Sequence, residues 1–167
     1  AARLDRTAWI HLTSGWVQPL VDILGNSAVW AAFQARHAAG ALVSGASAGA
    51  VALGQYAYAA RKPYPPDVED LVYDPLTGLG LLPGALILPH FNQLQSAVVD
   101  RITAIAPTRH ILIGIDEQSA LVRDSDGWVV MGEGEVSIRA AHGYERRFPA
   151  GTRLPPDVLP SPVDEVH

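Results

Sequence analysis

Two continuous apolar runs constrain the fold of this chain more than any other feature. Residues 84–88 and 111–115 are apolar at nearly every position, without the alternation of a strand that has one wet face. A third, shorter run covers residues 41–43. Segments that favour helices, 17–24, 28 to about 40 and 94–105, separate these runs, and Ser27 is placed to cap the second. The alternation predicts an α/β fold with a mostly parallel sheet and helices on both faces.

The pattern changes after residue 116. Short segments at 120–123, 128–131 and 135–139 are separated by the turn sequences 124–127 and 132–134, which predicts antiparallel hairpin strands near the C-terminus. Residues 148–167 are rich in proline and lack apolar periodicity, so we expect a loosely packed tail. We interpret residues 1–167 as a single α/β domain, with residues 61–74 as an exposed loop.

Composition excludes several classes of function. The net charge of −5, without a basic stripe, argues against nucleic-acid binding. The absence of cysteine removes disulfides, thiol nucleophiles and thiolate metal sites. No apolar run approaches the length of a membrane span, so we expect a soluble, cytoplasmic protein that does not act at a membrane.

A serine flanked by small residues lies at a predicted strand-to-helix junction. Ser47 stands in Gly45-Ala46-Ser47-Ala48-Gly49, between the apolar run 41–43 and the alanine-rich, helix-compatible segment 48–59. This arrangement is typical of a nucleophile elbow, in which helix amides can bind developing negative charge above the serine. Small residues at such a junction can also serve close packing alone.

His90 and Glu117 each follow an apolar run, as Ser47 does. Since ligands of open parallel sheets bind at the carboxyl ends of the strands, the three side chains are expected at one edge. A serine needs a base, and a histidine needs a carboxylate that fixes its tautomer. Asp116 could take the place of Glu117. The order serine, histidine, acid disfavours an α/β-hydrolase, in which the acid precedes the histidine.

Four motifs resemble peptidase family S51, which includes aspartyl dipeptidases and cyanophycinases on a class I glutamine amidotransferase-like fold. They are Gly45-Ala46-Ser47-Ala48-Gly49-Ala50, the phrase at 78–84, Pro89-His90-Phe91 with Gln93, and Gly114-Ile115-Asp116-Glu117 with Ala120-Leu121. They occur in the family's order between about residues 8 and 138. One turn departs from the family: Thr13-Ser14-Gly15-Trp16 stands where Thr-Gly-Gly-Asp/Asn is usual. Because this turn helps shape the substrate pocket in the family, the resemblance does not specify the substrate.

The resemblance implies a role for each matching residue. Ser47 would be the nucleophile, His90 the base and Glu117 the acid that orients it, with Asp67, Glu69 or Asp70 as the alternative acids of dipeptidase-like members. Backbone amides of Gly15 and Ala48 would form the oxyanion hole, and Trp16 and Gln93 would lie at the substrate. The chain would also lack the family's usual N-terminal strand-helix region.

The resulting hypothesis is a cofactor-free and metal-free serine peptidase. It would act on small peptides, including Asp-X dipeptides, through an acyl-enzyme on Ser47, and would form a homodimer. Two alternatives stay open: a cyanophycinase-like exopeptidase, and a non-catalytic peptide-binding or scaffolding module with the same fold. A glutamine amidotransferase is disfavoured because those enzymes use cysteine at the elbow, and the histidine spacing does not suggest a metal site.

Overall fold

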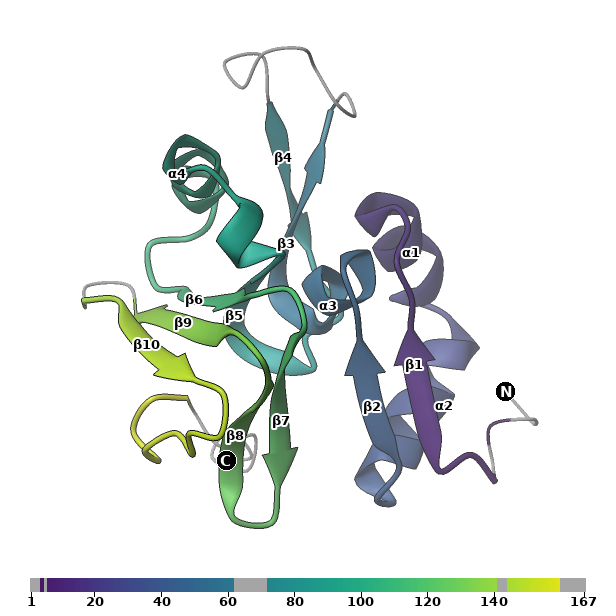
Figure 1. Ribbon diagram of the computed structural model, residues 1–167. Helices are drawn as coiled ribbons and strands as arrows, with labels where there is room; N and C mark the ends of the chain where they lie inside the picture. Colours follow the sequence, from purple (N-terminus) through teal and green to yellow (C-terminus); the bar gives the residue numbers. More distant parts are fainter. Residues whose placement is uncertain (1–3, 5, 62–71, 141–143, 160–167) are drawn as a thin grey trace.

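The computed structural model describes residues 4, 6–61, 72–140 and 144–159 (Figure 1). Their strands are β1 (Trp9–Leu12), β2 (Leu42–Gly45), β3 (Gly54–Ala60), β4 (Tyr73–Thr77), β5 (Leu82–Pro89), β6 (Ile111–Ile115), β7 (Ser119–Asp124), β8 (Gly127–Gly132), β9 (Glu135–Ala140) and β10 (Arg146–Pro149). The helices are α1 (Val17–Leu24), α2 (Ala28–Ala38), α3 (Ala48–Leu53), the short 3₁₀ helix η2 (Phe91–Gln93) and α4 (Ser96–Ala104). The mixed α/β class predicted from the sequence is confirmed.

A six-stranded sheet in the order β10-β9-β6-β5-β3-β4 forms the centre of the molecule. Strands β3, β5 and β6 are parallel, and antiparallel strands flank them on both sides: β4 on β3, and β9 with β10 on β6. The parallel strands β1 and β2 form a separate pair, and β7 and β8 form the predicted antiparallel hairpin. The parallel register places the ends of β5 and β6 side by side, with Pro89 opposite Ile115.

Side chains alternate between two cores across this sheet. Leu86, Leu88 and Leu112 pack with Ile102 of α4 on one face. On the other face, Ile113 belongs to a cluster that contains Ala50 of α3, Val130 of the hairpin and residues of the C-terminal segment. The apolar runs are therefore continuous because their strands are covered on both sides.

Helices α1 and α2 pack with the β1–β2 pair in a third cluster that includes Ile10, Val21 and Trp30. The hydroxyl of Ser27 accepts a hydrogen bond from the Trp30 amide at 3.1 Å, as expected of an N-cap. Helix α3 connects this part to the central sheet, because Ala52 lies in the N-terminal cluster and Ala50 in the sheet cluster.

The helix expected over residues 48–59 is too long. Helix α3 ends at Leu53, and residues 54–60 form β3 instead. Hydrogen bonding to β4 and β5 on either side outweighs the helix propensity of the alanines. Residues 73 and 74, expected in a loop, begin β4.

The C-terminal segment is packed more closely than its proline content suggested. Phe148, Leu154 and Leu159 are buried against the sheet, so residues 148–159 are not a loose tail. Their apolar side chains are too widely spaced to show a helix or strand period. Residues 160–167 lie outside the described part of the chain.

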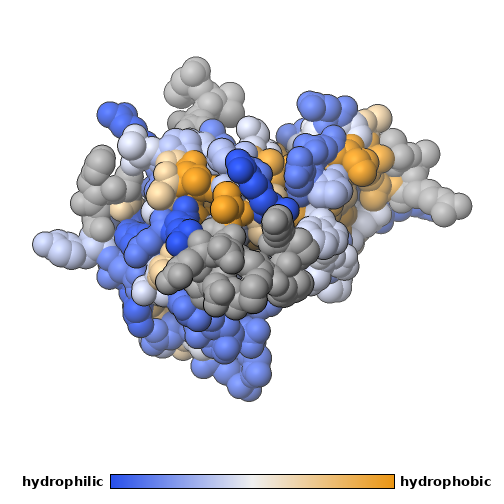
Figure 2. Space-filling view, turned by 90° about the horizontal axis from the view of Figure 1, so that it is seen from above, coloured by the Kyte–Doolittle hydropathy of each residue, from blue (hydrophilic) through white to orange (hydrophobic). Residues whose placement is uncertain are grey.

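Hydrophobic surface is not confined to the interior. Among the described residues, most of the large apolar side chains that are exposed lie before position 43: Trp9, Trp16, Ile23, Val29 and Leu42. The face seen from above carries orange hydrophobic patches between hydrophilic ones (Figure 2). None of the helices within the described residues has the length and hydrophobicity needed to cross a bilayer.

Candidate active site

Ser47 lies at a sharp bend between β2 and α3. Its backbone has φ 52° and ψ −119°, a conformation that residues with a side chain rarely adopt. The neighbouring glycines make the bend possible: a Cβ on Gly45 would lie 2.5 Å from the carbonyl oxygen of Gly49, and one on Gly49 would overlap the backbone of Leu12. The bend turns the serine hydroxyl out at the N-terminus of α3, as an elbow requires.

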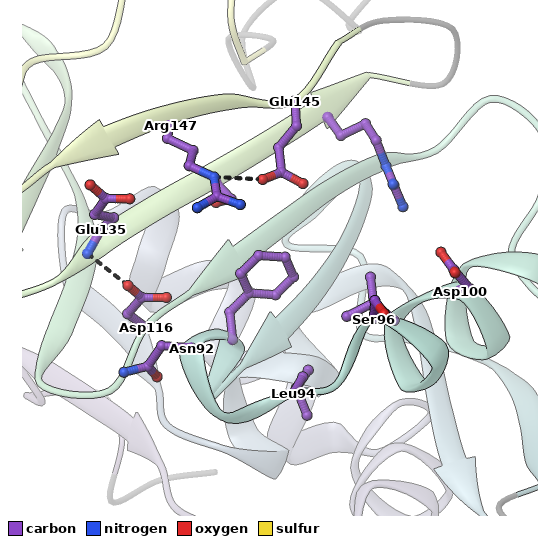
Figure 3. A pocket seen from close by; sticks show the side chains of 12 residues that line it. Asn92, Leu94, Ser96, Asp100, Asp116, Glu135, Glu145 and Arg147 are labelled. Atoms are coloured by element: carbon purple, nitrogen blue, oxygen red, sulfur yellow. Dashed lines mark hydrogen bonds and ion pairs between the residues drawn. The ribbon is translucent and has the colours of Figure 1, made fainter. Parts of the chain in front are cut away.

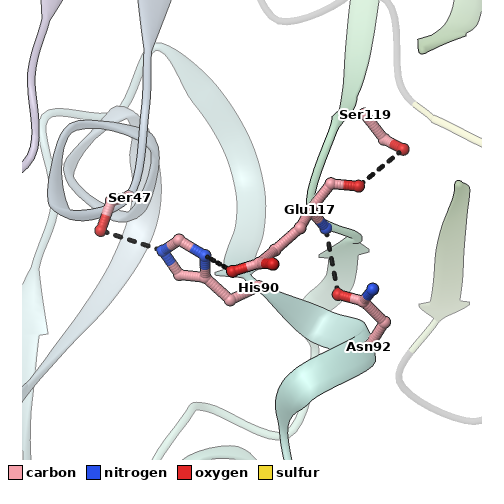
Figure 4. A network of polar contacts seen from close by, with 5 residues as sticks. All are labelled: Ser47, His90, Asn92, Glu117 and Ser119. Atoms are coloured by element: carbon pink, nitrogen blue, oxygen red, sulfur yellow. Dashed lines mark hydrogen bonds and ion pairs between the residues drawn. The ribbon is translucent and has the colours of Figure 1, made fainter. Parts of the chain in front are cut away.

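Ser47, His90 and Glu117 lie in contact although they are far apart in the sequence (Figure 4). His90 Nε2 is 3.2 Å from the Ser47 hydroxyl, and His90 Nδ1 is 3.2 Å from Glu117 Oε1. When Nδ1 carries the proton and donates to the carboxylate, Nε2 is left to accept the serine proton. The arrangement can therefore move a proton away from the hydroxyl.

The imidazole and the carboxylate are each about half exposed, with 48% of each side chain accessible. Solvent screens such a pair, so its contact adds little to the stability of the fold. Its effect is on the orientation and tautomer of the histidine.

The position of His90 depends on the turn that follows β5. The residue has a left-handed backbone, with φ 56° and ψ 33°, and its carbonyl oxygen accepts the Gln93 amide. The ring of Phe91 packs on β6 at Gly114, where a Cβ would come within 2.5 Å of the ring. The missing side chain at Gly114 thus leaves space for the turn that carries the histidine.

Glu117, and not Asp116, faces the histidine. Asp116 points the other way, and its Oδ2 accepts the backbone amide of Glu135 at 3.1 Å. Asp67, Glu69 and Asp70, the alternative acids, lie outside the described residues.

Polar side chains that sequence reasoning missed hold the loop of Glu117. Asn92 Oδ1 accepts the Glu117 amide at 3.0 Å, and the Ser119 hydroxyl donates to the Glu117 carbonyl at 3.3 Å (Figure 4). Gln118, which follows Glu117 in this loop, has a left-handed backbone with φ 57°. A single polar residue such as Asn92 gives no periodic signal, so only its closeness to His90 could have drawn attention to it.

The remaining predicted residues lie on segments that adjoin those of Ser47 and His90. Gly15 belongs to the turn after β1, and Leu12 of β1 pairs with Gly45 of β2, so this turn and the elbow follow neighbouring strands. Ala48 is the first residue of α3 and is buried. Trp16 precedes α1 and is 62% exposed, and Gln93 is exposed in η2.

A second serine–histidine contact occurs on the β1–β2 pair. The Ser44 hydroxyl lies 2.8 Å from His11 Nδ1 and accepts a hydrogen bond from Trp9 Nε1 at 2.8 Å. Ser44 lies within a regular strand, and no carboxylate is seen at His11 among the described residues. This contact therefore lacks both the bend and the acid found at Ser47.

No group of three or more His, Asp or Glu side chains in the described part of the chain is arranged to hold a metal ion.

Comparison with known proteins gives consistent results. The profile of Peptidase family S51 matches residues 2–131. Cyanophycinase from Trichormus variabilis (strain ATCC 29413 / PCC 7937) is 34% identical over 141 residues, which are 82% of this chain and 46% of the relative. Cyanophycinase from Synechococcus elongatus is 32% identical over 142 residues, 82% of this chain and 43% of the relative.

A solved structure is also similar. The crystal structure of a peptidase from an acI-B1 Actinobacterium superposes with a TM-score of 0.75 at 28% identity, covering 92% of this chain and 61% of that one. The present chain spans less than half the length of these cyanophycinases. The profile match and the identity to the cyanophycinases together show that the chain belongs to peptidase family S51.

Proposed function

We propose that this protein is a serine peptidase that cleaves small peptides through an acyl-enzyme on Ser47. The observation that supports the proposal most is the chain of contacts from Ser47 through His90 to Glu117. Membership of a peptidase family and the strained bend at the serine support it further.

Each residue has a defined task in the proposed reaction. His90 Nε2 takes the proton of the Ser47 hydroxyl as the oxygen attacks the peptide carbonyl, and Glu117 stabilises the imidazolium that results. The amides of Ala48 and Gly15 would donate to the oxyanion. The imidazolium then protonates the leaving amine, and water hydrolyses the ester in a second, equivalent step.

The substrate is the less constrained part of the proposal. Small peptides are the proposed class, with Asp-X dipeptides as the first candidates. The similarity to cyanophycinases makes cyanophycin the second candidate. Trp16 and Gln93 would contact the substrate. We further propose a class I glutamine amidotransferase-like fold, with serine in place of cysteine at the elbow.

Replacement of the nucleophile tests the proposed function. Ser47→Ala should lower kcat/KM on a responsive peptide by about 10⁴-fold, because the acyl-enzyme cannot form. The matched control is Ser44→Ala, which removes the hydroxyl of the second serine–histidine contact and should leave activity unchanged. Equal activity of wild type and Ser47→Ala would refute the proposal.

A non-catalytic binding module is the alternative that the same protein sample can test. It would bind small peptides without reacting with a serine-directed phosphonate. Mass spectrometry of the treated protein distinguishes the two, since the proposed enzyme gains one adduct, located at Ser47.

We also propose that the protein forms a homodimer. Trp9 and Leu42 are partners in the β1–β2 register and are 61% and 51% exposed, which gives this face an apolar surface that a second copy could cover. Sedimentation velocity should show a dimer that Trp9→Ser weakens. A monomer at all concentrations would contradict this.

A further inference from the structure

A cavity of about 310 Å³ lies between the η2–α4 segment and strands β9 and β10 (Figure 3). Its volume is in the range that holds a small molecule. Ser47, His90 and Glu117 are not among the residues that line it. The charged residues that line it are Asp100, Asp116, Glu135, Arg139, Glu145 and Arg147, and Ser137 lines it as well.

The cavity exposes a polar face of β9. Glu135, Ser137 and Arg139, at alternate positions of the strand, all line it, whereas Val136 and Ile138 lie in the core on the opposite face. Leu112 of the adjacent strand β6 is fully buried in the cluster with α4. The sheet surface thus changes from apolar to polar where the cavity begins.

Ser137 is the most informative of these residues. It is only 4% exposed, and its side chain makes no hydrogen bond with any residue that the structure describes. Among the described residues, every side-chain oxygen or nitrogen that is fully inaccessible to solvent has a hydrogen-bond partner. Since the Ser137 hydroxyl has none, it must be accessible, and it faces the cavity that Ser137 lines. The hydroxyl is therefore free to donate to, or accept from, a polar ligand in the cavity.

The lining carries four carboxylates and two guanidinium groups, Arg139 and Arg147, and this balance favours a cation. Glu145 is engaged by Arg147 at 2.8 Å, and one oxygen of Asp116 accepts the Glu135 amide. The second oxygen of Asp116 and the Glu135 carboxylate have no partner among the described residues. A metal ion is disfavoured because the described acids and histidines form no group able to hold one.

We propose that this cavity binds a small molecule that carries a primary ammonium group on a short aliphatic body. An ammonium has three donors and no acceptor, and Asp116, Glu135 and Ser137 offer an acceptor each. Phe91, Leu94 and Val99 form an apolar wall for the aliphatic part. Free α-amino acids belong to this class. Arg147 bonds Glu145 through Nε, and its terminal nitrogens remain to donate to the carboxylate of the amino acid.

Isothermal titration with three four-carbon probes tests the proposal. Butylamine carries the ammonium alone, 2-aminobutyrate carries both charged groups, and butyrate carries the carboxylate alone. Butylamine and 2-aminobutyrate should bind, and butyrate should not. Absence of binding by both amines, or equal binding by butyrate, would overturn the proposal.

Variants locate the site. Glu135→Gln and Ser137→Ala should each weaken butylamine binding, Glu135→Gln by about 10-fold or more because a charge-assisted hydrogen bond is lost. Glu133→Gln is the matched control, because Glu133 is exposed and does not line the cavity. Neither Glu135 nor Ser137 belongs to the proposed peptidase site, so weaker binding by these variants separates the cavity from that site. Unchanged binding by folded Glu135→Gln and Ser137→Ala would refute the assignment.

Discussion

The residues with strained backbones are concentrated at the candidate active site. Among the described residues, the only ones other than glycine with positive φ are Ser47, His90 and Gln118. Two of these carry the proposed chemistry, and the third follows Glu117. Such conformations cost about 1–3 kcal/mol each and persist where the surrounding structure imposes them. The strain is therefore a second, independent indication of the site.

Ser47→Gly should stabilise the protein while abolishing its activity. Glycine adopts positive φ without steric cost, and Ser47 makes no capping hydrogen bond that would be lost. We expect the free energy of unfolding to rise by about 1 kcal/mol, the strain relieved less the entropy cost of glycine. Ser47→Ala keeps the strain and is the control. Equal unfolding free energies of the two variants in urea would contradict this account.

Asn92 is expected to act through Glu117. Asn92→Leu removes the acceptor of the Glu117 amide, so the carboxylate is no longer held against His90. We expect kcat to fall by about 10- to 100-fold with little change in KM. Asn92→Asp keeps the acceptor and should retain most of the activity.

A double-mutant cycle separates this role from a general effect on folding. In a Glu117→Ala background, Asn92→Leu should cause little further loss, because the group it positions is already gone. Asn26→Leu, an exposed site between α1 and α2, is the control. Equal losses in both backgrounds would show that Asn92 does not act through Glu117.

At the scale of elements, an ion pair joins the β7–β8 hairpin to the C-terminal segment. The Arg153 guanidinium donates to both carboxylate oxygens of Asp124, at 2.8 and 2.9 Å. The backbone of Arg153 also forms an isolated antiparallel β-bridge with Val129 of β8. The hydrogen bond from Arg153 is the main cause that lowers the pKa of Asp124 to about 2, from 3.8. The segment that the sequence suggested to be loose is thus fixed to the hairpin.

The stability contributed by this pair should depend on pH. The folded pKa of Asp124 is below its unfolded value, so the contribution is complete above about pH 4 and is lost as the pH falls towards 2. Asp124→Asn should therefore differ most from wild type at neutral pH, and the difference should shrink between pH 4 and 2. Urea unfolding across this range, with Asp126→Asn as the control, measures it. A difference that is constant with pH would refute the assignment.

At the scale of the whole molecule, the sequence predicts best what depends on buried periodicity. The strands at 84–88 and 111–115 show as apolar runs because both of their faces are covered, and their ends place His90 and Glu117. Strands β3 and β4 could not be predicted in this way, because they are only partly buried and form no continuous apolar run.

The two halves of the molecule should unfold as one unit because α3 packs into both. Leu112→Ala removes a fully buried side chain from the central sheet, which should cost about 2–5 kcal/mol. Trp30 lies in the N-terminal cluster, remote from this change. If α3 couples the clusters, Leu112→Ala should lower the urea midpoint measured by Trp30 fluorescence by the same amount as the midpoint measured by circular dichroism. The measurement is tryptophan fluorescence. In all of the proteins compared, Trp9, Trp16 and Trp128 are replaced by Phe, so that Trp30 is the only fluorescent tryptophan.

An exposed apolar residue provides the control for this experiment. Ile23→Ala, at a side chain that is 76% exposed, should change the unfolding free energy by less than about 1 kcal/mol. If Leu112→Ala shifts the circular dichroism transition and leaves the Trp30 transition in place, the clusters unfold independently. Ala50 and Ala52 place one residue of α3 in each cluster. Independent unfolding would mean that these contacts are too weak for α3 to hold the nucleophile rigidly against the strands that carry its base and acid.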